Sequence, residues 1–134
     1  MTEIAVAVII EGNELVLSKR LDHVHQGGKW EFPGGKVEAG ETAAKALVRE
    51  CFEELAIKVK GAALVDTFDF EYPGKALTFH VFFVDDFSGT PRGIEGQEVA
   101  RVHWSVLREL EFPEANIRMI DLVERHFKHQ EGDS

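Results

Sequence analysis

The sequence predicts an α/β fold in which helices pack against a mixed β-sheet. Short apolar runs rich in β-branched and aromatic residues have the length of strands, and two longer segments, 42–55 and 115–127, have the periodicity of amphipathic helices. Strands combined with one central and one C-terminal helix are typical of a layered sandwich. With 134 residues, 44% of them hydrophobic, we expect a single domain over residues 1–130, followed by a frayed tail at 131–134.

The first part of the chain is expected to form a β-hairpin followed by a loop. Ile4 to Ile10 and Leu15 to Lys19 are strand-like, and the turn residues Gly12-Asn13 lie between them. The segment from Arg20 to Lys29 is polar and contains adjacent glycines, which indicates a loop. Trp30 to Phe32 is expected to form a brief strand that leads into a second glycine pair.

A helix is expected from Thr42 to about Leu55, where good helix formers occur and Gly and Pro are absent. Thr42 is a suitable N-cap. On a helical wheel an apolar stripe and an acidic group occupy opposite sides, so we expect one buried face and one acidic face. The stripe consists of Ala44, Val48, Cys51 and Leu55, and the acidic group consists of Glu50, Glu53 and Glu54.

The second half of the chain is expected to supply further strands and a second helix. Strand-like runs span Ile57 to Phe70 and Leu77 to Val84, and the Pro73-Gly74 pair between them suits a type II turn. We expect these two strands to form an antiparallel hairpin in the centre of the sheet. The elements that follow are a Gly-rich loop at 88–96, a strand at 99–104, a helical turn capped by Ser105 and a helix at 115–127.

Composition narrows the function classes. The formal net charge of −9 argues against a nucleic-acid-binding surface, which would need a basic patch. The N-terminal segment has an acidic residue where a signal peptide is positively charged, and its apolar run is too short to span a membrane. We therefore expect a cytoplasmic protein without membrane contact. The single cysteine excludes an internal disulfide, and Cys51 is expected to be part of the core.

The clustered glutamates suggest a metal site. Carboxylates one turn apart on a helix repel one another, and a bound cation removes that cost. Mg²⁺ and Mn²⁺ favour oxygen ligands, and Mg²⁺ commonly binds through one or two carboxylates together with waters and substrate phosphates. The alternative is a solvated acidic face, which such charge runs often are. An acidic protein would act on an anionic polyphosphate only if bound metal reversed the local charge.

The spacing around this helix resembles the signature of the Nudix hydrolases, GX5EX7REUXEEXGU, in which U is a bulky aliphatic residue. A match at so many fixed positions is specific. Two positions differ, since Cys51 occupies the first U site and Ala56 replaces the final Gly. A Gly just after a helix often adopts a left-handed conformation that costs Ala about 1 kcal/mol, so this departure concerns the helix exit. The residues in register are Gly35, Glu41, Arg49, Glu50, Glu53, Glu54 and Ile57.

Other segments resemble the bacterial MutT branch of this family, whose members hydrolyse oxidised guanine nucleoside triphosphates to the monophosphate and pyrophosphate. They occur in a common order along nearly the whole chain: a Lys-Arg pair, WEFPGGK, FDFEYP, GIEGQE and FPEAN. The resemblance implies a Nudix-type α/β/α sandwich with a mixed β-sheet. It also implies an 8-oxo-dGTP diphosphatase that sanitises the nucleotide pool, a role in mutation avoidance during DNA replication and repair.

The resemblance implies metal-assisted attack of water on a phosphorus atom of the polyphosphate chain. A divalent cation would neutralise the phosphate oxygens, orient the water and lower its pKa. The implied cation is Mg²⁺, with Mn²⁺ as a possible substitute. Its implied ligands are Glu50, Glu53, Glu54, Glu95 and the backbone carbonyl of Gly34.

Roles in proton transfer and in positioning also follow from the resemblance. Glu50 is the expected base that accepts the water proton, with Glu53 or Glu95 as the alternative. Arg49 and Glu41 are expected to orient the helix and the preceding loop through a charge pair. Gly35 is expected to have a structural role in the motif.

The resemblance places the nucleotide beside this site. Asn116 would read the purine base, a task that suits an amide with both a donor and an acceptor, although Asn116 could instead be a helix N-cap. Phe32 and Tyr72 could provide apolar walls for the base, and Tyr72 could equally be an ordinary core residue. The other implied substrate-binding residues are Arg20, His25, Glu31, Pro33 and Gly34.

Two other functions remain open. A Nudix pyrophosphohydrolase acting on CTP or modified dCTP would share the WEF and GGK segments and a similar length. A non-catalytic Nudix-fold module that binds a nucleotide belongs to a different class, and such modules tend to lose the glutamates that this chain keeps. Mg²⁺-dependent release of pyrophosphate would distinguish the enzymes from the module. In either case we expect a monomer whose partner is a small nucleotide.

Overall fold

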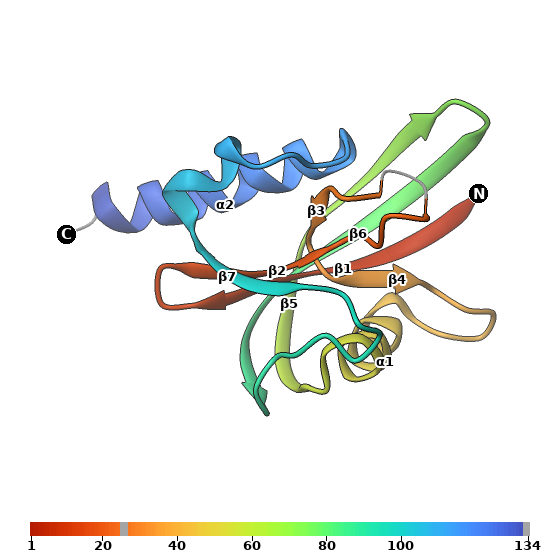
Figure 1. Ribbon diagram of the computed structural model, residues 1–134, viewed down its shortest axis with the longest axis horizontal. Helices are drawn as coiled ribbons and strands as arrows, with labels where there is room; N and C mark the ends of the chain where they lie inside the picture. Colours follow the sequence, from red (N-terminus) through yellow and green to blue (C-terminus); the bar gives the residue numbers. More distant parts are fainter. Residues whose placement is uncertain (25–26, 133–134) are drawn as a thin grey trace.

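The computed structural model describes residues 1–24 and 27–132, and it shows one mixed β-sheet with helices on both faces (Figure 1). This arrangement confirms the predicted α/β sandwich. The strands are β1 (Thr2–Glu11), β2 (Glu14–Lys19), β3 (Trp30–Glu31), β4 (Gly34–Lys36), β5 (Lys58–Tyr72), β6 (Lys75–Ser88) and β7 (Val99–His103). The helices are α1 (Ala43–Leu55), the 3₁₀ helix η1 (Trp104–Glu109) and α2 (Ala115–Gly132).

The sheet is organised around β1. Its strands run in the order β3-β2-β1-β6-β5, with β4 also paired to β1 and β7 to β2. β1 and β6 are parallel, and the β1–β2 hairpin predicted around Gly12-Asn13 is present. The predicted β5–β6 hairpin also forms, but its position in the centre of the sheet is wrong. Because β6 pairs with the apolar β1, β5 is left at the edge, where most of its residues are exposed or half-buried.

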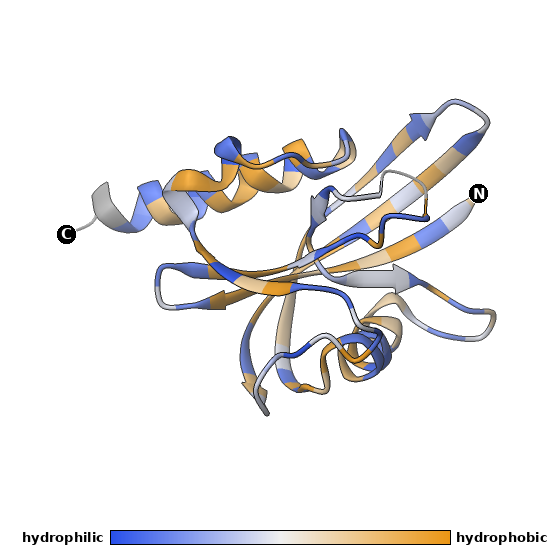
Figure 2. Ribbon diagram, in the orientation of Figure 1, coloured by the Kyte–Doolittle hydropathy of each residue, from blue (hydrophilic) through white to orange (hydrophobic). Residues whose placement is uncertain are grey.

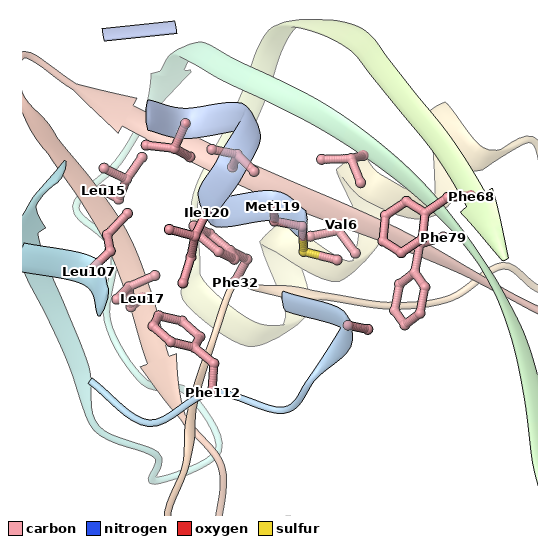
Figure 3. Close-up of a cluster of buried hydrophobic side chains, with 14 of the residues drawn as sticks. Val6, Leu15, Leu17, Phe32, Phe68, Phe79, Leu107, Phe112, Met119 and Ile120 are labelled. Carbon is pink, nitrogen blue, oxygen red and sulfur yellow. The ribbon is translucent and has the colours of Figure 1, made fainter. Parts of the chain in front are cut away.

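Both faces of β1 are buried, and this explains its continuous apolar run. Ala5 and Ala7 belong to the hydrophobic cluster beneath α1, whereas Val6 and Val8 belong to the cluster beneath α2. Figure 2 shows the apolar colouring on the central strands and on the sheet-facing sides of both helices. In Figure 3, Met119 and Ile120 of α2 lie over Val6, Leu15, Leu17 and Phe32.

Helix α1 starts as predicted, but its buried face is rotated from the predicted one. Thr42 is the N-cap, and its Oγ1 accepts a hydrogen bond from the Lys45 backbone N–H at 3.1 Å. Ala44 and Val48 are exposed, so half of the predicted stripe is wrong. The side chains that α1 buries are Ala46, Leu47, Cys51 and Leu55.

The rotation has a physical cause in β4, a strand that the sequence analysis did not predict. Gly34 and Gly35 pair with β1 directly beneath α1 and carry no side chains, so the helix packs closely over them. Glu50 and Glu54 therefore point toward the sheet beside the buried stripe, and only Glu53 is largely exposed, at 55% of its side chain. The expected separation into an apolar face and an opposite acidic face is wrong for Glu50 and Glu54.

The helix exit behaves as the motif predicts, although the residue is not Gly. Ala56 is the C-cap in the left-handed region, with φ 57° and ψ 30°, and its N–H donates to the Phe52 carbonyl. We predict that Ala56→Gly stabilises the protein by about 1 kcal/mol, because glycine adopts this conformation without the Cβ clash. Urea unfolding would measure the change. The matched control Ala44→Gly, at an exposed site with ordinary helical backbone, should destabilise the protein. A change in the free energy of unfolding in the same direction for both variants would contradict this explanation.

Near the C-terminus the predicted elements form with shifted ends. The N-cap of η1 is His103, whose Nδ1 accepts from the Ser105 N–H at 3.1 Å, so the prediction of a Ser105 cap is wrong. α2 begins at the predicted residue but continues to Gly132, into the segment where a frayed tail was expected. None of the helices within residues 1–24 and 27–132 combines the length and apolar character needed to cross a membrane.

Candidate active site

Two glutamates of α1 lie against the backbone of β4. The Glu54 Oε2 atom accepts a hydrogen bond from the Gly34 N–H at 3.3 Å. A Cβ atom added to Gly35 would lie 2.3 Å from the carboxyl carbon of Glu50, so only glycine leaves room for that carboxylate. The glycine pair and the helix thus form one local unit, as the motif spacing requires.

Arg49 connects this unit to the loop before the helix. Its Nε donates to Glu41 at 2.8 Å, and its Nη2 donates to the Lys36 carbonyl at 3.0 Å. Its Nη1 donates to Glu50 at 2.8 Å and to Glu53 at 3.2 Å. The hydrogen bond from Arg49 is the main cause that lowers the pKa of Glu41 to about 2. The Arg49–Glu41 pair thus has the geometry expected of a group that orients the helix and the loop.

Glu54 is the most perturbed carboxyl group of the site. Its pKa is raised to about 9, first by burial and then by the nearby carboxylates of Glu50 and Glu31. The hydrogen bond from the Gly34 backbone opposes this shift. Glu54 therefore stays protonated at neutral pH unless a cation compensates its charge.

Cys51, on the same helix, is fully buried. Burial, followed by the charges of Glu54 and Glu50, raises the pKa of its thiol to about 12. A thiol that stays protonated and inaccessible is a poor nucleophile. The prediction that Cys51 is a core residue is confirmed.

The loop between β6 and β7, residues 89–98, brings Glu95 to the same place. Its Ile94 N–H donates to the Glu54 carbonyl at 3.1 Å, and its Arg92 N–H donates to the Leu55 carbonyl at 3.1 Å. Glu95 then lines a cavity of about 160 Å³ together with Glu54 and Glu31. We call Glu31, Glu50, Glu54 and Glu95 the acidic cluster.

The donor set suits a divalent cation in its chemistry. Carboxylates and a backbone carbonyl are the hard oxygen ligands that such ions prefer. Burial and the neighbouring carboxylates of Glu50 and Glu31 both raise the pKa of Glu54, so a cation at this site would favour its ionised form. In the described part of the chain, no three His, Cys, Asp or Glu side chains already converge on one point as a metal site. Instead, Arg49 holds Glu50 and Glu53. The residues fit a cation that would draw them together with a substrate phosphate.

A second cavity, of about 500 Å³, lies beside the acidic cluster. Asn116 is only 8% exposed, and its Oδ1 accepts a hydrogen bond from the Phe32 N–H at 3.3 Å. Since Asn116 is the second residue of α2 and bonds to a different element, the alternative of a helix N-cap is wrong. Phe32 stacks on Phe112 at a centroid distance of 5.7 Å. We call this space the Asn116 cavity.

Tyr72 also lines the Asn116 cavity. Its hydroxyl oxygen accepts a hydrogen bond from the Ala115 N–H at 3.0 Å, so the ring is fixed against the start of α2. Its pKa is raised, chiefly by burial. The residue therefore combines the two roles that the sequence left open, a packed aromatic and a cavity wall.

Arg20 and Glu31 join the two cavities, since both line the Asn116 cavity and the cavity of Glu95. The Arg20 Nη1 atom donates to both carboxylate oxygens of Glu31, at 3.0 and 2.9 Å. Burial raises the pKa of Glu31, and the Arg20 guanidinium partly offsets that rise. A molecule that filled the Asn116 cavity could thus extend past this ion pair to the acidic cluster.

Other expected residues lie elsewhere. Pro33 is buried, and its carbonyl accepts a hydrogen bond from the Ala7 N–H at 2.7 Å, so it fixes β4 to β1 and does not line the Asn116 cavity. His25 lies outside the described residues. Gly34 lines the Asn116 cavity as expected.

Several residues of the Asn116 cavity were missed by the sequence analysis. Lys36 and Lys75 place two cationic side chains along its wall. Most of the apolar wall comes from alternate residues of β1 and β6, with Met119 added from α2. The alternation along the two strands was the available signal. These strands were expected to be ordinary core, so their side chains were not predicted to line a cavity. The apolar residues are Ile4, Val6, Leu77, Phe79 and Met119.

A larger hollow, of about 1050 Å³, lies between α2 and the far ends of β5 and β6, lined among others by Asp85, His126 and Gln130. It is open, and none of the glutamates of the acidic cluster or of α1 lines it. Size alone is therefore a poor guide here. The candidate active site is the smaller space that adjoins the acidic cluster.

Comparison with known proteins agrees with this geometry. The NUDIX domain family model matches residues 1–126. The chain belongs to the Nudix hydrolase family. Members of this family are generally dependent on divalent metal ions. The glycine pair, Arg49 and the α1 glutamates are the residues of this Nudix hydrolase that carry the family signature.

This Nudix hydrolase is similar to named relatives and to solved structures. The 8-oxo-dGTP diphosphatase of Haemophilus influenzae is 42% identical over 110 residues, covering 82% of this chain and 81% of that protein. The CTP pyrophosphohydrolase of Escherichia coli is 37% identical over 113 residues, covering 84% of this chain and 82% of that protein. A solved structure from work on MutT of Aliivibrio salmonicida and Vibrio cholerae aligns with a TM-score of 0.82 and 40% identity, covering 91% and 95% of the two chains.

Proposed function

We propose that this Nudix hydrolase is a Mg²⁺-dependent pyrophosphohydrolase that converts 8-oxo-dGTP to 8-oxo-dGMP and pyrophosphate. The supporting observation is that the Asn116 cavity adjoins the acidic cluster through the Arg20–Glu31 pair. A nucleotide whose base lay in the Asn116 cavity would direct its polyphosphate chain toward the acidic cluster. The relatives named as 8-oxo-dGTP diphosphatases support this substrate.

The proposed base recognition uses the amide of Asn116. Because its Oδ1 accepts from the Phe32 N–H, its amino group remains as a donor toward the cavity. The carbonyl groups at C6 and C8 of 8-oxoguanine are acceptors for such a donor. Phe32 and Tyr72 would enclose the ring, and the cationic Lys36 and Lys75 would favour an anionic ligand.

The proposed chemistry is hydrolysis at the polyphosphate chain. Glu50, Glu53, Glu54, Glu95 and the Gly34 carbonyl would hold Mg²⁺ or Mn²⁺, which when bound supplies charge neutralisation and activation of water. Glu50 is the proposed base, with Glu53 or Glu95 as the alternative. The hydrogen bond from Arg49 orients the Glu50 carboxylate. Glu31 and Arg20 would stay beside the phosphate chain and position it.

Pyrophosphate release tests this proposal. The substrates 8-oxo-dGTP, dGTP, CTP and dCTP would be compared with Mg²⁺ at low concentration by their relative kcat/KM. We expect 8-oxo-dGTP to be preferred by about 100-fold or more, equivalent to about 2.7 kcal/mol in the transition state. A preference for the cytidine nucleotides would instead support the CTP pyrophosphohydrolase, which the similarity to the Escherichia coli enzyme favours as the second candidate. No release from any of them would support either another diphosphate substrate or a nucleotide-binding module.

Replacing Asn116 with Ala is predicted to weaken discrimination between 8-oxo-dGTP and dGTP by about 10-fold or more, because a base-specific hydrogen-bonding amide contributes about 1–3 kcal/mol. Hydrolysis of dGTP should change much less. Since the variant also leaves the Phe32 N–H unpaired, Asn116→Asp is a second test that retains an acceptor for this group. Asn13→Ala, in the exposed turn between β1 and β2, is the control. Unchanged discrimination in both Asn116 variants would place base recognition elsewhere.

A further inference from the structure

One side chain, that of Gln97, joins the loop of residues 89–98 to the C-terminal end of α1. Its Nε2 donates to the Glu54 backbone carbonyl at 3.0 Å. Its Oε1 accepts from the Glu95 backbone N–H at 2.9 Å. A single planar amide therefore connects the main chains of two members of the acidic cluster that are far apart in the sequence.

The end of α1 requires partners of this kind. The last carbonyls of a helix have no donors within the helix. Here the Glu54 carbonyl receives both the Ile94 N–H and the Gln97 side chain, and the Leu55 carbonyl receives the Arg92 N–H. The loop replaces the missing next turn, so the place of Glu54 depends on how the loop is held.

The loop itself is closed tightly around Gln97. The Gly96 N–H donates to the Gly93 carbonyl at 3.2 Å, and a Cβ atom added to Gly93 would lie 1.9 Å from the Gln97 backbone oxygen. Within the part of the chain that the structure describes, the Glu95 carboxylate has no hydrogen-bond or ion-pair partner. The backbone that Gln97 holds therefore sets the point from which the Glu95 side chain extends.

We propose that Gln97 is a positioning residue that fixes Glu95 relative to Glu54 and thereby sets the affinity of the site for divalent cations. The side chain would act through the two backbones, without contact to the cation or the reacting atoms. This inference rests on the proposed function, because it takes both glutamates as ligands. It extends that function by naming the group that holds Glu95 of the loop in position relative to Glu54 of α1.

Two variants test whether the pair of hydrogen bonds from Gln97 to the Glu54 and Glu95 backbones is needed, or only an amide at this position. Gln97→Met has a similar length but makes neither hydrogen bond, and Gln97→Asn keeps the amide but is too short to span both partners. Glu98→Gln, at the exposed neighbouring position, is the matched control. For each protein, Mn²⁺ binding without nucleotide would be measured by electron paramagnetic resonance, and thermal unfolding would be measured in EDTA. The constants kcat and KM would be measured at one Mn²⁺ concentration, close to the dissociation constant of the parent protein.

We expect both Gln97 variants to bind Mn²⁺ at least about 10-fold more weakly, the usual effect of removing a group that orients a ligand. Their kcat should fall with little change in KM, and their melting temperatures in EDTA should stay close to the parent value. Parent-like Mn²⁺ affinity in Gln97→Met would overturn the proposal, as would parent-like affinity in Gln97→Asn. If the melting temperature in EDTA fell enough to explain the weaker Mn²⁺ binding, the proposal would also fail, because Gln97 would then only stabilise the fold. If the parent binds Mn²⁺ but hydrolyses no nucleotide, the proposed function fails and the binding comparison still tests Gln97.

Discussion

The variant Glu54→Gln is expected to lose at least about 100-fold of the metal-dependent turnover while remaining folded. A neutral amide is a poor ligand for a hard divalent cation, and loss of groups that only support such ligands already costs about 10–100-fold. The fold should persist because the amide oxygen can still accept the hydrogen bond from the Gly34 N–H. Glu53→Gln should also abolish turnover. Glu109→Gln, an exposed change of equal charge in η1, is the control.

The same variant should alter how stability depends on pH. An ordinary Glu carboxyl has a pKa of 4.5, and in the folded protein the pKa of Glu54 is raised to about 9, mainly by burial. Between these two pKa values the folded state retains a proton that the unfolded chain releases. The contribution of Glu54 to the free energy of unfolding is therefore complete below pH 4.5 and is lost as the pH rises toward 9. In EDTA, the parent should lose stability over this range, and Glu54→Gln should lose less. Parallel curves, or near-normal turnover in both Gln variants, would refute the role assigned to the buried carboxyl.

The two adjacent glycines of β4 should lose different properties on substitution with Ala, turnover at Gly35 and stability at Gly34. In Gly35→Ala the added methyl group would meet the Glu50 carboxylate, with its nearest atom at 2.3 Å. That side chain can move, so the protein should fold, but its carboxylate would be displaced and turnover should fall about 10–100-fold. Activity would be measured beside urea unfolding. Gly35→Ala with full activity would show that the placement of Glu50 is not required.

In Gly34→Ala the added methyl group would lie 2.1 Å from the Ala5 carbonyl oxygen and 3.0 Å from the Val6 Cα. These atoms are backbone of the central strand and cannot yield separately, so we expect a loss of about 3 kcal/mol or more in the free energy of unfolding. Gly61→Ala in β5, where the nearest atom would be 3.5 Å away, is the control. A stable Gly34→Ala protein would mean that β4 can shift from β1.

Patterns confined to one stretch of the chain predicted their structures well. Thr42 caps α1 because its partner, the Lys45 N–H, is three residues away. The left-handed Ala56 follows from its place in the motif. The motif also predicted the family, because the spacing of its residues from Gly35 to Glu54 depends only on one turn and one helix. Each of these predictions needs only geometry that the local sequence specifies.

Predictions failed where distant segments decide the outcome. Helical periodicity alone could not show that the glycines of β4 would lie under α1 and turn Glu50 and Glu54 toward the sheet. The edge position of β5 depends on the parallel pairing of β6 with β1, which no local signal specifies. Gln97 was overlooked for the same reason, since its significance lies in reaching Glu54 across the fold.

The parallel pairing of β1 with β6 also has a consequence for synthesis of the protein. β1 leaves the ribosome before the other strands of the sheet, yet its register joins Thr2 to Leu77 and Ile9 to Val84. It therefore cannot complete the sheet until β6 has emerged. Until then the nascent chain exposes an apolar strand with an unpaired edge, a state prone to wrong association. The strand that organises the finished sheet is therefore the segment for which we expect chaperone protection to matter most during translation.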